Sequence, residues 1–210
     1  MDKKIKSKQD KKLNPRKLAS KTGAKETVKS ILDAAALILE QNSFGNYTTN
    51  GIASRAGVSI GSLYQYFPNK DSITITLIER ESASLVSCME AIAQMSSFKE
   101  GIRLLIKAAV DYQMARPALA KRLDFEEARL VALNAPLENA AMAKSLLFKF
   151  FSRHVPESMP VAAIVGDVMA IMKALNDRAG FADDRDIEKL EAKILAAVSG
   201  YLSLYSLVAI

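Results

Sequence analysis

The sequence predicts an all-α protein, and three observations support that fold class. Apolar residues recur every three or four positions along most of the chain, which is the spacing of one buried helical face. No stretch alternates apolar and polar residues as a half-buried strand does. Gly and Pro interrupt the pattern at short intervals, and Ala and Leu are abundant. With 210 residues, 50% of them apolar, the chain can bury a sizeable core in one large domain or two smaller ones.

Residues 1–24 are expected to form a basic, flexible arm. Residues 1–26 hold ten Lys or Arg and three acidic residues, a net charge of +7, so 19 basic and 20 acidic residues remain in the rest of the chain. The arm lacks apolar periodicity and therefore has no face to bury. Two interpretations stay open: a solvated tail, or an arm that adds affinity by contacting DNA phosphates or a minor groove.

Residues 26–41 predict the first helix, whose task is to support the two helices after it. Residues 42–47 are expected to form a loop, with Gly45 as the breaker. The apolar face of the helix consists of Val28, Ile31, Leu32, Ala35, Ile38 and Leu39.

Residues 48–67 predict two short helices joined by a tight turn. Thr48 and Ser59 are good N-cap residues for the two helices. Gly57 can take the left-handed conformation that ends a helix, and Pro68 closes the second one. Two short helices that share an apolar face across a glycine turn are typical of a helix-turn-helix.

The outer face of the second motif helix indicates what the motif binds. It offers hydroxyls, an amide and phenols but no formal charge, a set suited to hydrogen bonds with phosphates and base edges in a DNA major groove. Gly61 has no side chain, so the backbone there can approach a phosphate closely. The face consists of Ser59, Ile60, Gly61, Ser62, Tyr64, Gln65 and Tyr66.

Residues 56–70 read AGVSIGSLYQYFPNK, a string that closely resembles the DNA-binding domain of TetR-type transcriptional regulators. The resemblance covers residues 25–85 and implies that residues 86–210 bind an effector and dimerise. Beyond residue 85, only the helical character and the length match. Gly51 departs from the pattern, since relatives usually carry a charged or polar residue there. The glycine removes a possible capping box or phosphate contact and costs about 1 kcal/mol of helix propensity.

A fourth helix is expected over residues 69–94, with Asn69 as its cap and Asp71 in its first turn. Lys70 could hold a phosphate there together with nearby backbone N–H groups. Five further helices follow, separated by short breaks at Pro and Gly. They are expected at residues 99–115, 117–133, 136–153, 161–178 and 185–208, with a break at residues 180–184.

The last two helices carry more apolar residues than one buried face needs. The surplus indicates either a central core helix or a two-fold dimer face. The resemblance favours a homodimer through these two helices, and such a dimer would read a palindromic operator in double-stranded DNA. The residues concerned are Val161, Ile164, Val165, Val168, Met169, Ile171, Met172 and Leu175, then Ile187, Leu190, Ile194, Leu195, Val198, Tyr201, Leu202, Leu204 and Tyr205.

Seven of the eight Met residues follow residue 88, where Met fills irregular core gaps or lines an adaptable pocket. The resemblance implies a pocket for a small-molecule effector in this part of the chain. The apolar candidates for its lining are Met89, Met114, Phe125, Met142, Phe148, Phe151 and Met172, and the polar candidates are Tyr112, Gln113 and Glu126.

The sequence indicates no metal site, no cofactor and no catalytic site. His154 is the only histidine and Cys88 the only cysteine, so neither a zinc motif nor an internal disulfide is expected. No glycine-rich phosphate loop or nucleophile elbow is present. The basic N-terminus is not followed by an apolar segment, and no apolar run approaches about 18 residues. We therefore expect a cytoplasmic protein that neither catalyses a reaction nor enters a membrane.

The resemblance implies a homodimeric transcriptional regulator, most often a repressor, that an effector releases from DNA by shifting the fourth helix. The alternative is a nonspecific or architectural DNA-binding dimer without an effector. Base contacts are expected from Ser62 and Gln65, since Gln can pair with adenine through two hydrogen bonds. Phosphate contacts are expected from Thr48, Thr49, Ser59, Tyr64, Tyr66 and Lys70.

Overall fold

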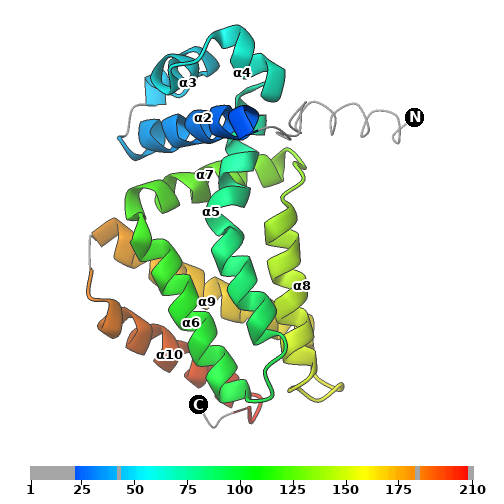
Figure 1. Cartoon of the computed structure of the whole chain (residues 1–210). Coiled ribbons are helices and arrows are strands. Elements are labelled where there is room, and N and C mark those ends of the chain that lie inside the picture. Colours follow the sequence, from blue (N-terminus) through cyan, green and yellow to red (C-terminus); the bar gives the residue numbers. More distant parts are fainter. Residues whose placement is uncertain (1–21, 42–43, 183–184, 208–210) are drawn as a thin grey trace. The chain divides into compact units, whose positions relative to one another are not determined.

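The computed structural model describes residues 22–41, 44–182 and 185–207, and every regular element in these ranges is helical (Figure 1). The predicted all-α class is confirmed. Within the same ranges, no helix combines the length and the apolar character that crossing a membrane requires. The elements are α2 (Thr22–Glu40), η1 (Phe44–Asn46), α3 (Thr49–Ala56), α4 (Ile60–Tyr66), α5 (Lys70–Ile92), α6 (Phe98–Ala115), α7 (Pro117–Ala132), α8 (Glu138–Ser152), α9 (Val161–Ala182) and α10 (Ile187–Ser203).

The arm predicted at residues 1–24 lies outside the described residues, except for its last three positions. Those three already belong to α2, so the predicted start of the first helix at residue 26 is wrong. Ala24 packs against the core, and the Thr27 hydroxyl donates a hydrogen bond to the Gly23 carbonyl at 2.9 Å. These contacts make the first turn of α2 helical although its sequence is polar.

The helices α5 to α8 begin and end within two residues of their predicted bounds, but the last two helices differ more. α9 continues through Gly180, where a break was predicted, because Ala179 is buried and its turn packs on the rest of the core. α10 begins after Asp186, whose carboxylate accepts a hydrogen bond from the Lys189 backbone N–H at 3.0 Å. It ends at Ser203, five residues before the predicted end.

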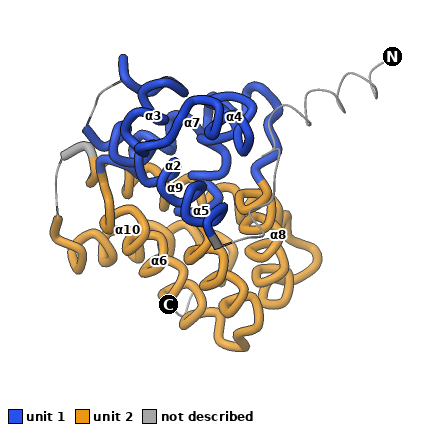
Figure 2. Tube along the Cα trace, turned by 45° about the horizontal axis from the view of Figure 1, so that its top comes forward, with its two compact units in different colours: residues 1–81, 118–137 blue, residues 82–117, 138–210 orange. Residues whose placement is uncertain are grey.

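The chain forms two compact units, and α7 belongs to the first of them (Figure 2). Unit 1 consists of the described residues of 1–81 together with 118–137, and unit 2 of 82–117 with the described residues of 138–210. The sequence placed a single boundary after residue 85. In the structure, α5 has residues in both units, and α7 supplies Leu119, Leu123 and Leu130 to the core of unit 1.

Many of the large apolar residues of α9 and α10 pack in the core of unit 2. Eight of the seventeen are buried within the chain itself, namely Ile164, Val165, Val168, Met172, Leu190, Ile194, Val198 and Leu202, whereas Met169, Ile187 and Leu204 are exposed. The surfaces that these two helices leave exposed are also rich in Ala and Gly. The core of unit 2 therefore accounts for part of the apolar surplus of these two helices.

An aromatic cluster joins α6 to α8 in unit 2. The rings of Phe98 and Phe150 stack with their centroids 5.6 Å apart. An added Cβ at Gly101 would overlap the Phe150 ring, so this glycine lets the ring reach the backbone of α6. The two ring nitrogens of His154 lie 2.8 and 3.0 Å from the carbonyl oxygens of Phe150 and Ser96.

Candidate nucleic-acid interface

The two motif helices begin and end at the residues that the sequence indicated. The Thr48 hydroxyl accepts a hydrogen bond from the backbone N–H of Gly51 at 3.1 Å, and the Ser59 hydroxyl accepts one from Ser62 at 3.0 Å. Gly57 takes the left-handed conformation at φ 67° and ψ 27°, and its N–H caps the end of α3. The predicted caps and the predicted turn are confirmed.

Gly51 is required by its surroundings, although the sequence identified it only as a departure from the family pattern. A Cβ at this position would clash with the backbone carbonyl oxygen of Asn46, which also accepts a hydrogen bond from the Thr48 N–H at 2.8 Å. The short helix η1 brings that carbonyl against α3. The helix propensity lost at Gly51 therefore allows the preceding turn to pack closely.

The inner faces of α3 and α4 share one core, and Tyr66 is part of it. Ile52, Leu63 and Phe67 are fully buried. Tyr66 is 8% exposed, so its predicted place on the outer face is wrong. It lies three residues after Leu63, and residues at that spacing point to the same side of a helix.

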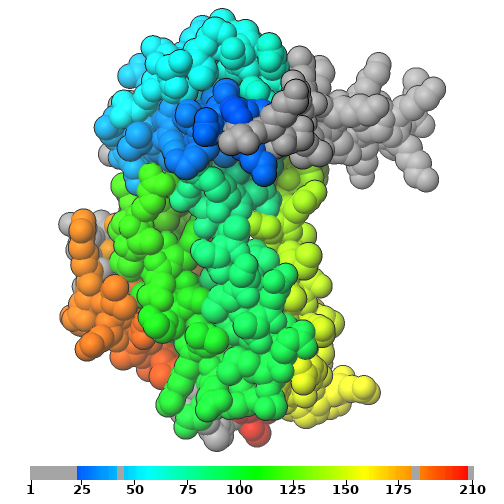
Figure 3. All heavy atoms as spheres, viewed as in Figure 1, coloured from blue at the N-terminus to red at the C-terminus, as the bar shows by residue number. Residues whose placement is uncertain are grey.

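The exposed face of α4 is polar and uncharged, as predicted. Ser59, Gly61, Tyr64 and Gln65 are exposed, as is Ile60, while Ser62 is half-buried. The hydroxyls of Tyr64 and Thr49 lie 3.2 Å apart and link α4 to the start of α3. The atoms of α3 and α4 are drawn in cyan at the surface of the molecule in Figure 3.

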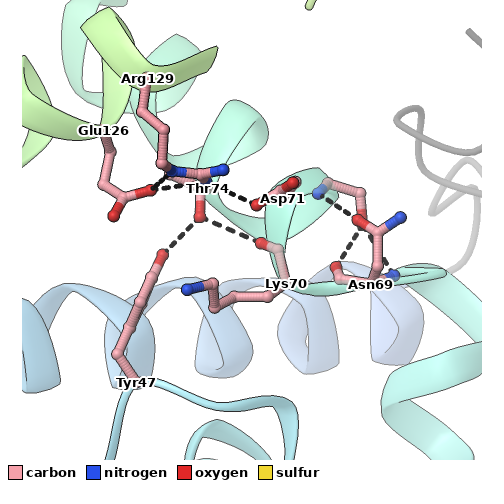
Figure 4. A network of polar contacts seen from close by, with 8 residues as sticks. Tyr47, Asn69, Lys70, Asp71, Thr74, Glu126 and Arg129 are labelled. Atoms are coloured by element: carbon pink, nitrogen blue, oxygen red, sulfur yellow. Dashed lines mark hydrogen bonds and ion pairs between the residues drawn. The ribbon is translucent and has the colours of Figure 1, made fainter. Parts of the chain in front are cut away.

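Lys70 begins α5 and points toward the ring of Tyr47, with its Nζ atom 5.1 Å from the ring centroid (Figure 4). Asn69 caps this helix, since its Oδ1 atom accepts a hydrogen bond from the Ser72 N–H at 2.9 Å. The cation–π contact holds the ammonium next to the motif without neutralising it. Thr48 and Thr49 thus lie at the start of α3, and Lys70 lies at the start of α5, all within unit 1.

A buried hydroxyl pair lies beneath Lys70. The Thr74 hydroxyl donates to the Lys70 carbonyl at 3.0 Å, so its single proton is used there. The Tyr47 hydroxyl, 2.7 Å away, must then be the donor to Thr74. Burial raises the pKa of Tyr47 well above its usual value of 10.0, and the nearby carboxylates of Glu126 and Asp71 act in the same direction. Tyr47 therefore stays a neutral donor.

α7 is attached to the first turn of α5 by the Arg129 network, which consists of Arg129, Asp71 and Glu126 (Figure 4). The guanidinium lies 2.6 Å from Asp71 Oδ1 and 2.7 Å from Glu126 Oε2. The hydrogen bond to Asp71 is the largest cause that raises the pKa of Arg129, so this side chain stays charged. The sequence offered no signal for the bridge, and it placed Glu126 among the polar candidates for an effector pocket instead.

The candidate effector residues are distributed over both units. Met89, Gln113 and Met172 are buried in unit 2, and Tyr112 and Met114 are half-buried there. Phe151 is also buried, against Phe98 and Phe150. Phe125 belongs to unit 1, and its side chain is 63% exposed, while Met142 and Phe148 are exposed on α8. The sequence did not single out Asn176, a buried residue of α9.

Comparison with known proteins points to one family for the motif. The model for bacterial regulatory proteins of the tetR family matches residues 31–75, which include α3, α4 and the first turn of α5. The Fatty acid metabolism regulator protein of Bacillus subtilis (strain 168) is 34% identical over 77 residues, 36% of this chain and 40% of that relative. The chain thus matches less than half of that relative's length. The Nucleoid occlusion factor SlmA of Glaesserella parasuis serovar 5 is 23% identical over 183 residues, 87% of this chain and 78% of that relative.

Solved structures share the fold over most of the chain. The fatty acid degradation regulator FadR from Bacillus halodurans has a TM-score of 0.69 and 17% identity, and the match covers 81% of this chain and 93% of that one. A TetR-family transcriptional regulator from Streptomyces coelicolor has a TM-score of 0.64 and 19% identity, covering 85% and 97%. The SmeT–triclosan complex has a TM-score of 0.63 and 16% identity, covering 85% and 91%. At these identities, the likeness concerns the fold.

Proposed function

Because the chain belongs to the TetR family of bacterial regulatory proteins, we propose that it is a sequence-specific DNA-binding regulator of transcription. The observation that carries the proposal is the exposed face of α4, which offers hydrogen-bonding groups but no charge. Gln65 and Ser62 would contact base edges, where an amide can form two hydrogen bonds with adenine. Thr48, Thr49, Ser59, Tyr64 and Lys70 would contact phosphates.

The absence of a side chain at Gly61 is consistent with DNA binding by α4. A Cβ built there meets only the Ser59 hydroxyl oxygen, at 3.8 Å, so nothing inside the protein requires a glycine. A glycine in a helix costs up to about 1 kcal/mol relative to alanine, and Gly61 lies in the first turn of α4. The cost is understandable if a DNA backbone approaches α4 closely at this position.

The proposal includes a homodimer formed through α9 and α10. Both helices expose small residues on one side, and these include Gly166 on α9 and Gly200 on α10. A Cβ built at either glycine meets no atom within 4 Å, so the chain itself requires neither. Close approach of the same helices from a second copy gives these glycines a role. The small residues are Ala162, Ala163, Gly166, Ala170 and Ala174 on α9, and Ala192, Ala196 and Gly200 on α10.

The dimer is tested by placing a carboxylate on that surface. Ala170→Glu and Ala196→Glu should shift the chain from dimer to monomer in light scattering, because burying an unpaired charge is costly. Ala128→Glu makes the same change at an exposed position of α7 and should leave the mass unchanged. An unaltered dimer in both α9 and α10 variants would exclude this face.

We further propose a cytoplasmic repressor that a small-molecule effector releases from its operator. Relatives support this by analogy: a repressor named KstR from Rhodococcus jostii (strain RHA1) is 34% identical over 62 residues, and SmeT was solved with triclosan. α5 carries Lys70 at its start and contributes Met89 to the core of unit 2. An effector that binds the state unable to hold DNA more tightly would shift the protein toward that state.

The deciding experiment is selection of bound sequences from a random DNA pool at near-physiological salt. A sequence-specific dimer should recover one palindrome with half-sites spaced by whole helical turns. The competing proposal is a nonspecific or architectural DNA-binding dimer. The similarity to a nucleoid occlusion factor over 183 residues is the observation in its favour. Recovery of no motif, with binding that disappears as salt rises, would favour that competitor.

A further inference from the structure

Two carboxamide side chains lie buried at one end of unit 2. Gln113 near the end of α6 is 5% exposed, and Asn176 on α9 is 6% exposed. They are the buried polar residues of this unit within the described ranges, and neither carries a charge. The core around them is otherwise apolar. We refer to Gln113 and Asn176 as the carboxamide pair.

The Gln113 side chain on α6 reaches α9 within one turn of Asn176. The Gln113 Nε2 atom is 3.3 Å from a Cβ built on Gly180. Gly180 follows Asn176 by four residues, so both occupy the same side of α9, one turn apart. α6 and α9 pack against each other in unit 2. The carboxamide pair therefore forms one local polar group in an apolar core.

The Asn176 side-chain oxygen, Oδ1, is buried and has no hydrogen-bond donor in the described part of the chain. A buried acceptor without a donor costs roughly 1–3 kcal/mol, and most such groups in folded proteins have a partner. Replacement by Leu would remove the penalty at nearly the same volume. Because no described residue supplies the donor, the Oδ1 atom can accept a hydrogen bond from a bound molecule.

We propose that the carboxamide pair binds the polar end of the effector, and that this effector is a neutral molecule with a hydroxyl or amide group on an apolar body. Asn176 would accept its hydrogen bond, and the Gln113 carboxamide can both donate and accept beside it. Met172 and Val110 lie one turn before the pair on α9 and α6 and would contact the apolar body. A carboxylate would find no buried positive charge here, so an anion is disfavoured. This inference rests on the proposed regulatory function.

The probes are three molecules with the same number of carbon atoms. 1-Octanol and dibutyl ether are isomers, but only the alcohol donates a hydrogen bond, and octanoate carries a charge. Titration calorimetry on the full chain should show 1-octanol binding about five- to tenfold more tightly than dibutyl ether, which is the effect of one neutral hydrogen bond. Octanoate should bind more weakly than 1-octanol. Equal affinity for the two isomers, or no binding of 1-octanol, would overturn the proposal.

Variants locate the effect. Asn176→Leu should bind the two isomers equally, and Gln113→Leu should reduce the preference. Gln94→Leu removes an exposed carboxamide in the same unit and should keep the full preference. A preference that survives in Asn176→Leu would refute the site. If Asn176→Leu does not fold, the comparison of the isomers on the unaltered chain still decides.

The measurement separates this proposal from the one it rests on, because ligand binding is measured without DNA. Recovery of a palindrome from the random pool, with no discrimination between the isomers, would leave the regulator and remove the ligand site. Discrimination between the isomers, with no recovered sequence, would keep the ligand site and remove the operator.

Discussion

Replacing Arg129 by Met should destabilise unit 1. The substitution leaves the Glu126 carboxylate without its guanidinium, and the Glu126 side chain is only 7% exposed. Breaking a buried ion pair by removing one partner costs about 3–5 kcal/mol. Because Arg129 is 32% and Asp71 26% exposed, solvent screens part of the interaction. We therefore expect a loss of about 2–3 kcal/mol.

A double variant tests the cause of that loss. Arg129→Met combined with Glu126→Gln removes the orphaned charge and should recover about half of the lost stability, since the amide is cheaper to bury than a carboxylate. Urea unfolding followed by far-UV circular dichroism measures each variant. A loss of stability below about 0.5 kcal/mol for Arg129→Met would show that the Arg129 network contributes no more than an ordinary exposed ion pair. Equal stability of the single and the double variant would show that Glu126 is not the group left unpaired.

Three further expectations concern the motif and its support. Gly51→Ala should lower the free energy of unfolding by about 1–2 kcal/mol through the clash with Asn46. Gly61→Ala should raise the free energy of unfolding by up to about 1 kcal/mol and weaken DNA binding. Equal effects on stability at both sites would contradict the inference that only Gly51 is required by packing within the protein. Burial alone would raise the pKa of Asp33, but hydrogen bonds from Lys29 and Arg80 hold this pKa below its usual 3.8. The stability that Asp33→Asn removes should therefore be present at neutral pH and vanish as the pH falls below that value. This loss should not exceed about 1 kcal/mol, because Asp33 is 43% exposed, and a difference in stability that persists in acid would exclude the lowered pKa as its cause. Gln65→Ala should relax sequence preference in DNA binding more than it lowers nonspecific affinity, while an equal loss on all sequences would argue against base readout.

The motif could be predicted from sequence because its determinants are local. The caps at Thr48 and Ser59 act on backbone groups three residues away, and Gly57 needs only its own left-handed conformation. The place of Tyr66 was equally readable, since its spacing from Leu63 puts both on one face. The hydroxyl of Tyr66 suggested a DNA contact, but the three-residue spacing from Leu63 determines the side of the helix to which the Tyr66 side chain points.

Contacts between distant segments could not be predicted in the same way. Arg129 and Asp71 are separated by 58 positions, and nothing in either neighbourhood indicates the other. The reason for Gly51 depends on a carbonyl that η1 brings against α3. The continuation of α9 past Gly180 depends on tertiary packing that overrides a local breaker. In each case the deciding atom belongs to another element.

The buried polar side chains of the two units differ in whether they have hydrogen-bond partners. This difference distinguishes a structural role in unit 1 from the proposed ligand-binding role in unit 2. In unit 1, the buried Glu126 carboxylate pairs with Arg129 through its Oε2 atom, and the Tyr47 hydroxyl bonds to Thr74. Such a paired network fixes the geometry beneath Lys70. In unit 2, Asn176 carries no charge and keeps an acceptor that the described chain does not use. A buried group that is polar but unsatisfied reduces stability in the free protein, and a ligand that satisfies it recovers that free energy as affinity.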